Sequence, residues 1–156
     1  MPLIHWLQVE GFWSYYNHVV RPNDLPNSTD LHLFKEGVKP MWEDEENRKG
    51  GKWILRMKKG LASRQWEDLL LALVGGQMFT NEGLESQVCG AVMSVRFQED
   101  IISVWTKDAT DLNAKTAIRD ALKSALHLQS SVVMEYKAHD ASIKDNSSFR
   151  NTSLSS

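Results

Sequence analysis

The stretch VCGAVMSVRFQEDIISVWTK, residues 88–107, decides the fold, because it reads as two apolar strands separated by a short polar turn. We expect a two-residue turn at Glu99 and Asp100, which makes the stretch a β-hairpin. This register pairs Arg96 with Ser103. It gathers the apolar side chains on the other face: Val95, Phe97, Ile102 and Val104.

A longer turn is the alternative for this hairpin. A three-residue turn would place Arg96 among Ile102 and Val104, where an unpaired buried charge is costly. The two-residue turn is therefore favoured, and it also pairs Ser94 with Trp105. The hairpin then presents Trp105 and Arg96 together on a polar, open face of the sheet.

A second strand with a basic row is KWILRMKK, residues 52–59. Because successive side chains of a strand point to opposite faces, every second residue shares a face. One face carries Lys52, Ile54, Arg56 and Lys58, and the other carries Trp53, Leu55 and Met57. The strand therefore brings a row of positive charge to one side of the sheet.

The remaining elements give the fold class. Further strand patterns are LHLFKE (31–36) and SVVMEYKA (131–138), and helical periodicity covers 9–20, 61–76 and 110–126. In the second helix, Ser63 is the expected N-cap and Gly75 the expected end. No strand-helix-strand alternation with a glycine-rich phosphate loop occurs, so an α+β fold with an antiparallel sheet and helices on one face is favoured.

Composition limits the class of protein. The chain has 156 residues, 42% of them hydrophobic and 24% charged, which is typical of one globular domain. A net charge of -2 gives no general attraction for DNA. The single Cys89 excludes an internal disulfide, and no leader or membrane-spanning run is visible, so we expect a cytoplasmic protein without a membrane partner. Residues 146–156 read as a flexible polar tail.

Motifs of catalysis and metal binding are missing from the sequence. The five histidines show no ligand spacing with each other, with cysteine or with glutamate, and no Walker A loop, dinucleotide fingerprint or G-x-S-x-G motif occurs. Cys89 lies within an apolar strand pattern, which favours packing over nucleophilic chemistry. We therefore expect no catalytic residue, no metal site, no cofactor and no enzyme activity.

Aromatic, acidic and basic side chains together form a candidate ligand face. A flat cationic base with an anionic tail would satisfy all three kinds of side chain, by stacking, by hydrogen bonds to a carboxylate and by ion pairs. The messenger RNA cap, 7-methylguanosine triphosphate, has this chemistry. The alternative from pattern alone is that Trp42 is a packing residue. The candidate residues are Trp42, Glu43, Trp105, Lys52, Arg56 and Arg96.

Three long motifs resemble a known family. LHLFKEGVKPMWEDEENRKGGKWILR, VCGAVMSVRFQEDIISVWTK and VMEYKAHDASIKDNSSFRNT closely resemble the cap-binding translation initiation factor 4E family, in its 4E homologous protein branch. The resemblance runs from about Val9 to Thr152. It implies a curved antiparallel sheet with three helices packed on the convex face and the mRNA cap on the concave face.

The resemblance also implies roles for the candidate residues. Trp42 matches a base-stacking tryptophan, Glu43 the carboxylate that binds the guanine, and Trp105 the residue that touches the N7 methyl group. Three further positions match residues associated with the phosphates: Lys52, Arg56 and Arg96.

The N-terminal part departs from the family pattern. Family members carry further residues before the first helix, including the first strand and a second stacking aromatic, whereas residues 1–8 of this chain do not match. The resemblance thus implies an N-terminally truncated form: a divergent segment 1–8, a 4E-like domain 9–145 and the tail. Loss of one stacking partner would lower affinity about tenfold to a hundredfold. It would also leave a sheet edge open.

A second surface is implied on the helical side. In the family, it receives partner proteins through a helix motif of the type Tyr-x-x-x-x-Leu-hydrophobic. The matching residues are Val9, Trp13, Asp68, Leu71 and Gly75. The alternative for Trp13 is a core position.

These observations lead to one hypothesis and one runner-up. The hypothesis is a non-enzymatic protein that binds capped mRNA and regulates translation initiation, most simply by repressing it. The runner-up is a truncated isoform with an impaired cap slot that acts only by binding partner proteins.

Overall fold

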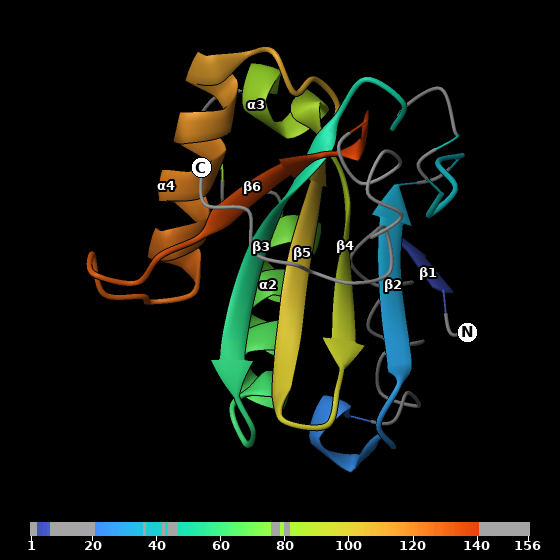
Figure 1. Cartoon of the computed structure of the whole chain (residues 1–156). Helices are drawn as coiled ribbons and strands as arrows, with labels where there is room; N and C mark the ends of the chain where they lie inside the picture. Colours follow the sequence, from blue (N-terminus) through green and yellow to red (C-terminus); the bar gives the residue numbers. More distant parts are fainter. Residues whose placement is uncertain are drawn as a thin grey trace.

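Six strands build a curved sheet in the order β1-β2-β4-β5-β3-β6, with the helices on one face (Figure 1). The structure, a computed structural model, describes residues 3–6, 21–35, 37–41, 43, 47–75, 79 and 82–140. The strands are β1 (Leu3–Trp6), β2 (Thr29–Lys35), β3 (Gly51–Lys58), β4 (Val88–Val95), β5 (Glu99–Thr106) and β6 (Glu135–Ala138). The five strands from β2 to β6 are antiparallel, which confirms the predicted α+β class.

The described helices differ in part from the predicted ones. They are α2 (Ala62–Val74), α3 (Glu82–Gln87) and α4 (Leu112–Ala125), preceded by a short 3-10 turn, η1 (Pro22–Asp24). The predictions at 61–76 and 110–126 are confirmed by α2 and α4, whereas the one at 9–20 lies outside the described residues. The sequence did not reveal α3, because its six residues are too few for a helical period to be recognised.

The N-terminal edge of the sheet is not left open as expected. Leu3–Trp6 pairs in parallel with β2, so that Leu3 lies opposite His32 and Trp6 opposite Lys35. The short β1 is therefore the edge strand, in place of β2. Its pairing satisfies backbone groups of β2 that an open edge would present to solvent or to another chain.

The hairpin of β4 and β5 has a different register from the predicted one. Ser103 lies opposite Val92 rather than Arg96, and Trp105 lies opposite Gly90 rather than Ser94. The slip is an even number of residues, so every side chain keeps its predicted face. Phe97 is the exception, because it leaves the apolar face and is 79% exposed.

We attribute the slip to two ion pairs, one with β3 and one with the residue that follows it. Arg56 binds Glu99 at 2.9 Å, and Lys59 binds Asp100 at 2.7 Å. Both acidic residues therefore remain in β5, and the turn forms before them. The Arg96 N–H donates to the Glu99 carbonyl at 3.1 Å, which closes a turn with Phe97 at its first central position.

The core lies between the sheet and the helices. Trp53, Leu55 and Met57 point into it from β3, as predicted, and they meet the fully buried Trp66 of α2. Burial of each large apolar side chain contributes roughly 1.5 to 3 kcal/mol. The Trp53 Nε1–H also donates to the Lys115 carbonyl at 3.1 Å, which ties the sheet to α4.

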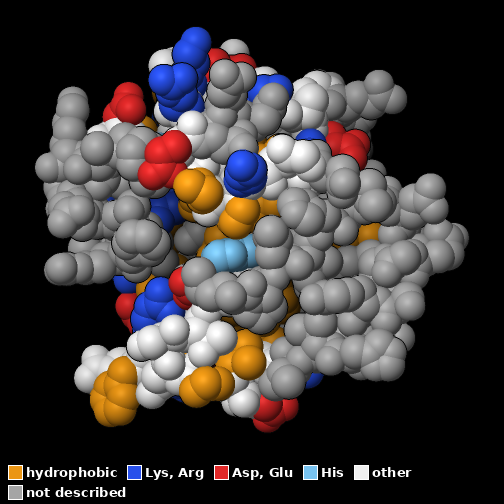
Figure 2. All heavy atoms as spheres, turned by 90° about the vertical axis from the view of Figure 1, so that its right-hand side faces the viewer, with side chains coloured by type: hydrophobic (Ala, Val, Ile, Leu, Met, Phe, Trp, Pro, Cys, Tyr) orange, Lys and Arg blue, Asp and Glu red, His pale blue; other side chains and the backbone are white. Residues whose placement is uncertain are grey.

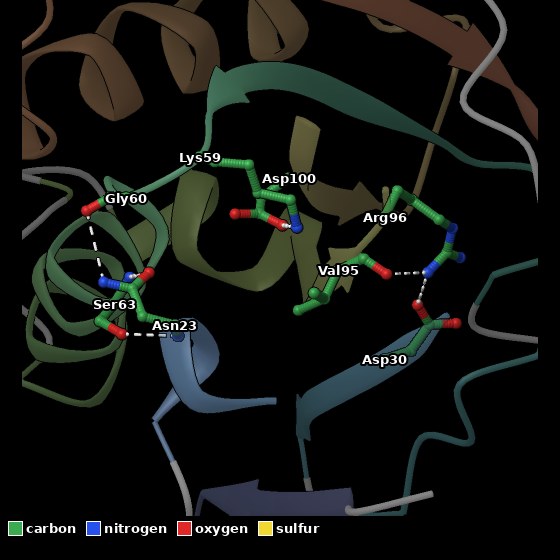
Figure 3. A network of polar contacts seen from close by, with 8 residues as sticks. All are labelled: Asn23, Asp30, Lys59, Gly60, Ser63, Val95, Arg96 and Asp100. Atoms are coloured by element: carbon green, nitrogen blue, oxygen red, sulfur yellow. Dashed lines mark hydrogen bonds and ion pairs between the residues drawn. The ribbon is translucent and has the colours of Figure 1, made fainter. Parts of the chain in front are cut away.

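The start of α2 is capped from another element. Leu61 rather than the predicted Ser63 occupies the N-cap position, and its side chain makes no capping bond. Instead, the Ser63 N–H donates to Oδ1 of Asn23 in η1, and the Asn23 N–H donates to Oγ of Ser63 (Figure 3). The Gly75 N–H donates to the Leu71 carbonyl, as expected at the end of a helix.

The start of α4 is capped by the side chain of its own N-cap residue, as is common in proteins. Asp111 is its N-cap, and Oδ1 of Asp111 accepts from the Ala114 N–H at 3.0 Å. Among the described residues, no helix combines the length and the apolar character needed to cross a membrane.

Candidate functional site

The face of the sheet opposite the helices carries Trp105 and the basic row. Trp105 lies opposite Lys52 of β3 and Gly90 of β4, and Lys52 in turn lies opposite Lys137 of β6. The predicted sharing of one face by Trp105, Lys52, Arg56 and Arg96 is therefore consistent with the pairing of these strands. We call this surface the open face.

Trp105 is held in position by two other rings. The ring of Phe34 meets it edge-on, with centroids 5.2 Å apart and planes at 86°. The imidazole of His139 lies 4.5 Å away at 52°. Phe34 also packs against Val38, Cys89 and Val92 in a small apolar cluster of its own. Trp105 thus remains half-buried, with its ring fixed from two sides.

A glycine makes this arrangement possible. A Cβ atom at Gly90 would collide with the ring of Phe34, so the absence of a side chain lets that ring lie across β4. Cys89 is buried beside it, at 3% exposure, as the sequence predicted for a packing cysteine.

His139 is a buried and neutral residue of the site. It is 2% exposed, and its Nε2 has no hydrogen-bond partner within the described part of the chain. Burial, and secondarily the charge of Lys52, lowers the pKa of His139 to about 4. The imidazole is therefore uncharged at neutral pH and contacts Trp105 as a neutral ring.

Two lysines are buried in the same row. Lys52 is 4% exposed and Lys137 is 2% exposed, and they lie opposite each other on β3 and β6. Burial, and then the charge of Lys137, lowers the pKa of Lys52 to about 8. The two ammonium groups bring positive charge to the same part of the open face, where each disfavours the charged form of the other.

Two arginines at the far end of the open face are held by carboxylates. Arg56 donates to Oε1 of Glu99 at 2.9 Å. Arg96 donates to Oδ1 of Asp30 at 2.8 Å and also to the Val95 carbonyl (Figure 3). Each guanidinium is about one-third exposed and has five N–H donors, so donors remain for a ligand.

The loop that carries Trp42 and Glu43 is only partly described. Trp42 lies outside the described residues, so its role as a base-stacking residue stays a prediction, and Glu43 is exposed in a turn. Asn47 is fully buried, and its Nδ2 donates at 2.7 Å to the carbonyls of Lys39 and Met41. This single side chain therefore joins position 47 to the segment that precedes position 42.

The helical side holds the second candidate set. Val9 and Trp13 lie outside the described residues. Leu71 of α2 is 47% exposed, and Gly75 is exposed at the end of this helix. A groove of about 340 Å³ lies between α2 and α4. It is lined by Asp68, Leu71, Ala72, Ala121, Ser124, Ala125 and His127.

Sequence reasoning missed four residues of these sites. Phe34, Asn47, Lys137 and His139 contribute to them through contacts between distant segments, which no local pattern signals. Asn47, followed by Gly50 and Gly51, is typical of a turn. This pattern does not indicate that the Asn47 side chain binds two carbonyls. Among the described residues, no cluster of three or more histidine, cysteine, aspartate or glutamate residues could hold a metal ion.

Comparison with known proteins places the chain in a family. Residues 2–154 match the family described as Eukaryotic initiation factor 4E. The chain belongs to this family. It is 54% identical over 152 residues to the protein named Eukaryotic translation initiation factor NCBP of Oryza sativa, and 49% identical over 144 residues to Eukaryotic translation initiation factor 4E-4 of Caenorhabditis elegans.

The initiation factor 4E relatives are longer than this chain. The match covers 97% of the chain and 65% of the Oryza protein, and 92% of the chain and 66% of the Caenorhabditis protein. The chain therefore spans about two thirds of the length of these curated relatives.

Solved structures of the family share the fold. The complex of C. elegans eIF4E-3 with the 4E-binding protein Mextli and cap analog superposes with a TM-score of 0.82 and 39% identity, covering 87% of this chain and 77% of that one. The complex of Ascaris suum eIF4E-3 with m7G cap gives a TM-score of 0.78 and 39% identity, covering 84% and 73%.

Proposed function

We propose that this chain binds the 7-methylguanosine cap of messenger RNA on its open face and regulates translation as a member of the 4E homologous protein branch. The observation that carries the proposal is the setting of Trp105, whose ring is fixed by Phe34 and His139 in the same row as Lys52. The solved structure of the relative Ascaris suum eIF4E-3 is a complex with m7G cap, which supports the same ligand here.

The chemistry of the methylated base fits the aromatic and acidic residues. Methylation at N7 makes the guanine cationic, which strengthens its attraction to an indole face. Trp42 stacks on the base, Glu43 accepts hydrogen bonds from its N–H donors, and Trp105 contacts the methyl group. A neutral His139 supports Trp105 without repelling the positive base, because its pKa is lowered to about 4.

The phosphates fit the basic row. Lys52 lies in the row of Trp105, and Arg56 and Arg96 lie further along the same face. The carboxylates of Glu99 and Asp30 hold the two arginines in place. Because partly exposed ion pairs contribute only about 0 to 1 kcal/mol, a phosphate can take over donors from them at low cost.

The helical side is proposed as a partner-binding surface. Solved relatives form complexes with the 4E-binding protein Mextli and with 4E-BP. The exposed Leu71 and the groove beside it suit the apolar face of an incoming helix, and the carboxylate of Asp68 can accept hydrogen bonds from its polar groups. Val9, Trp13 and Gly75 complete the proposed surface.

The proposed biological role follows from combining the two surfaces. A protein that occupies mRNA caps while it recruits partners other than the initiation scaffold represses translation. We place this role in the cytoplasm and assign the chain no reaction and no cofactor. The names of the relatives, which are all initiation factors, agree with a role in translation.

Tryptophan fluorescence tests the mRNA cap proposal directly. The chain is titrated in parallel with 7-methyl-GTP and with unmethylated GTP, after circular dichroism has established that it is folded. We expect quenching that is selective for the methylated ligand, and Trp105→Ala should lower that affinity about tenfold or more. Equal affinity for both nucleotides would contradict the proposal.

A second candidate function is favoured by the groove between α2 and α4. In this alternative, the chain acts only by binding partner helices, and its slot for the mRNA cap is idle. A peptide with the Tyr-x-x-x-x-Leu-hydrophobic motif should then bind, and Leu71→Ala should weaken it about tenfold. Leu112→Ala, which removes another exposed leucine from α4, is the matched control. Peptide binding without any response to 7-methyl-GTP would select this alternative.

A further inference from the structure

An exposed aromatic ring stands at the tip of the β4–β5 turn. Phe97 is 79% exposed, the highest exposure of any large apolar side chain in the described part of the chain. The turn is closed by the bond from the Arg96 N–H to the Glu99 carbonyl. Two-residue turns favour glycine, asparagine or aspartate at their central positions, so the turn itself does not require a phenyl ring.

The ring lies at the end of a row of basic side chains on the open face. Along β3, the row begins at Lys52 opposite Trp105, continues through Arg56 and ends at Lys58 opposite Glu99. From Trp105 to Glu99, β5 runs about 20 Å, at roughly 3.3 Å per residue. A ligand that starts at Trp105 and follows the positive charge therefore arrives at this turn.

The surroundings of the ring are charged rather than apolar. Arg96 precedes Phe97 and binds Asp30, and Arg56 binds the Glu99 that follows the turn. Lys58 is exposed beside them. Figure 2 shows exposed hydrophobic side chains at the lower end of the molecule, where the β4–β5 turn lies in Figure 1, and basic and acidic side chains somewhat higher on the left. A ring beside basic side chains is the arrangement that binds single-stranded nucleic acid, by ion pairs along the backbone and stacking on a base.

We propose that Phe97 is a stacking platform for a base of the nucleotides that follow the mRNA cap. The inference rests on the proposed function, because it continues the path of a ligand whose methylguanosine lies at Trp105. The preferred ligand is then capped single-stranded RNA rather than the free cap nucleotide. The basic row attracts the RNA backbone. The ring of Phe97 supplies affinity without selecting one base, since every base has a stacking face.

The test compares two ligands and four proteins. Affinities for 7-methyl-GTP and for a capped single-stranded RNA oligonucleotide are measured by fluorescence titration with the wild type, Phe97→Ala, Phe97→Tyr and Leu61→Ala. Leu61 is the matched control, because it is 51% exposed, has no ring and follows the end of β3, where Lys58 lies opposite Glu99. Phe97→Ala should lower affinity for the oligonucleotide about tenfold and leave 7-methyl-GTP unaffected, while Phe97→Tyr and Leu61→Ala resemble the wild type.

An oligonucleotide with abasic sites after the mRNA cap isolates stacking from charge. The abasic ligand should bind the wild type about as weakly as the complete ligand binds Phe97→Ala. The abasic ligand with Phe97→Ala should lose no more affinity than either change alone. Equal loss in Phe97→Ala with complete and abasic ligands would overturn a stacking role.

Two other results would overturn the inference in ways that can be told apart. If 7-methyl-GTP binds normally and Phe97→Ala does not weaken the oligonucleotide, the platform is wrong and the proposed function stands. If the wild type binds neither ligand, both are wrong. Analytical ultracentrifugation completes the test, because a wild-type dimer that Phe97→Ala converts to a monomer would make the tip an interface between copies of this chain.

Discussion

The imidazole of His139 lies 4.5 Å from the indole of Trp105, although the two residues come from strand β5 and from the segment after β6. The contact depends on a backbone bond, since the His139 N–H donates to the Gly50 carbonyl at 3.0 Å. Gly50 leads directly into β3, which carries Lys52. The backbone bond between His139 and Gly50 therefore brings together the histidine, the indole of Trp105 and Lys52, the first lysine of the basic row.

The first prediction concerns the pH dependence of stability. The pKa of His139 is lowered from 6.5 to about 4, so between these values the unfolded chain binds more protons than the native chain. The contribution of the neutral His139 to the free energy of unfolding is fully present above pH 6.5, and it is lost as the pH falls toward 4. From pH 7 to pH 5, this one group should lower the free energy of unfolding by about 2 kcal/mol.

Urea unfolding at several pH values measures this slope. His139→Gln should remove the part of the loss that comes from His139. His127→Asn, which replaces an exposed histidine by a residue that tolerates its positive φ of 55°, should keep the wild-type slope. A slope that is the same in all three proteins would contradict the assignment.

The second prediction concerns Gly90. In Gly90→Ala, the new Cβ meets the ring of Phe34 and the Leu33 carbonyl, so the strand or the ring must move. We expect a loss of about 1 to 3 kcal/mol in the free energy of unfolding, as in other overpacked sites. The emission of Trp105 should change at the same time, because Phe34 contacts its ring. Gln98→Ala, at an exposed position of the same hairpin, is the control, and an unchanged spectrum in Gly90→Ala would contradict the packing argument.

The faces of the strands could be predicted from the sequence, because burial imposes a period of two. Lys52 and Arg56 share one face of β3 and Trp53 lies on the other, as the pattern indicates. For the same reason, the side chains of β4 and β5 lie on their predicted faces, although the predicted register between the two strands was wrong. The turn of this hairpin depends on Arg56 and Lys59, which reach it from β3 and from the residue that follows β3, and the local pattern does not contain that information.

Other parts of the site depend on the order of the strands. Lys137 meets Lys52 only because β6 lies beside β3, and Phe34 reaches Trp105 only across β4. The capping of α2 by Asn23 likewise joins residues that are 40 positions apart. Local periodicity assigns a residue to a face, whereas its neighbours across the sheet follow from topology.

The third prediction concerns the ion pair of Arg96 and Asp30. Asp30→Asn removes the carboxylate that competes with a phosphate for the guanidinium, so affinity for 7-methyl-GTP should rise about two- to fivefold. Stability should fall by at most about 1 kcal/mol, since both side chains are partly exposed. The gain should shrink as salt is added. Asp120→Asn breaks the exposed pair with Arg119 on α4 and is the matched control. A weaker affinity in Asp30→Asn would mean that the carboxylate is needed to position Arg96.

The last prediction concerns the loop around position 42. Asn47→Ala removes the two bonds that Nδ2 donates to the carbonyls of Lys39 and Met41. Each bond contributes about 1 kcal/mol, so the free energy of unfolding should fall by about 2 kcal/mol. The loop also loses the contact that joins position 47 to the segment before position 42, so affinity for 7-methyl-GTP should fall several-fold in protein that is still folded. Asn23→Ala, which removes a capping bond at the start of α2, should lower stability by about 1 kcal/mol and leave the affinity unchanged. If Asn47→Ala lowers stability but not affinity, the loop is held by other contacts and Asn47 has only a structural role.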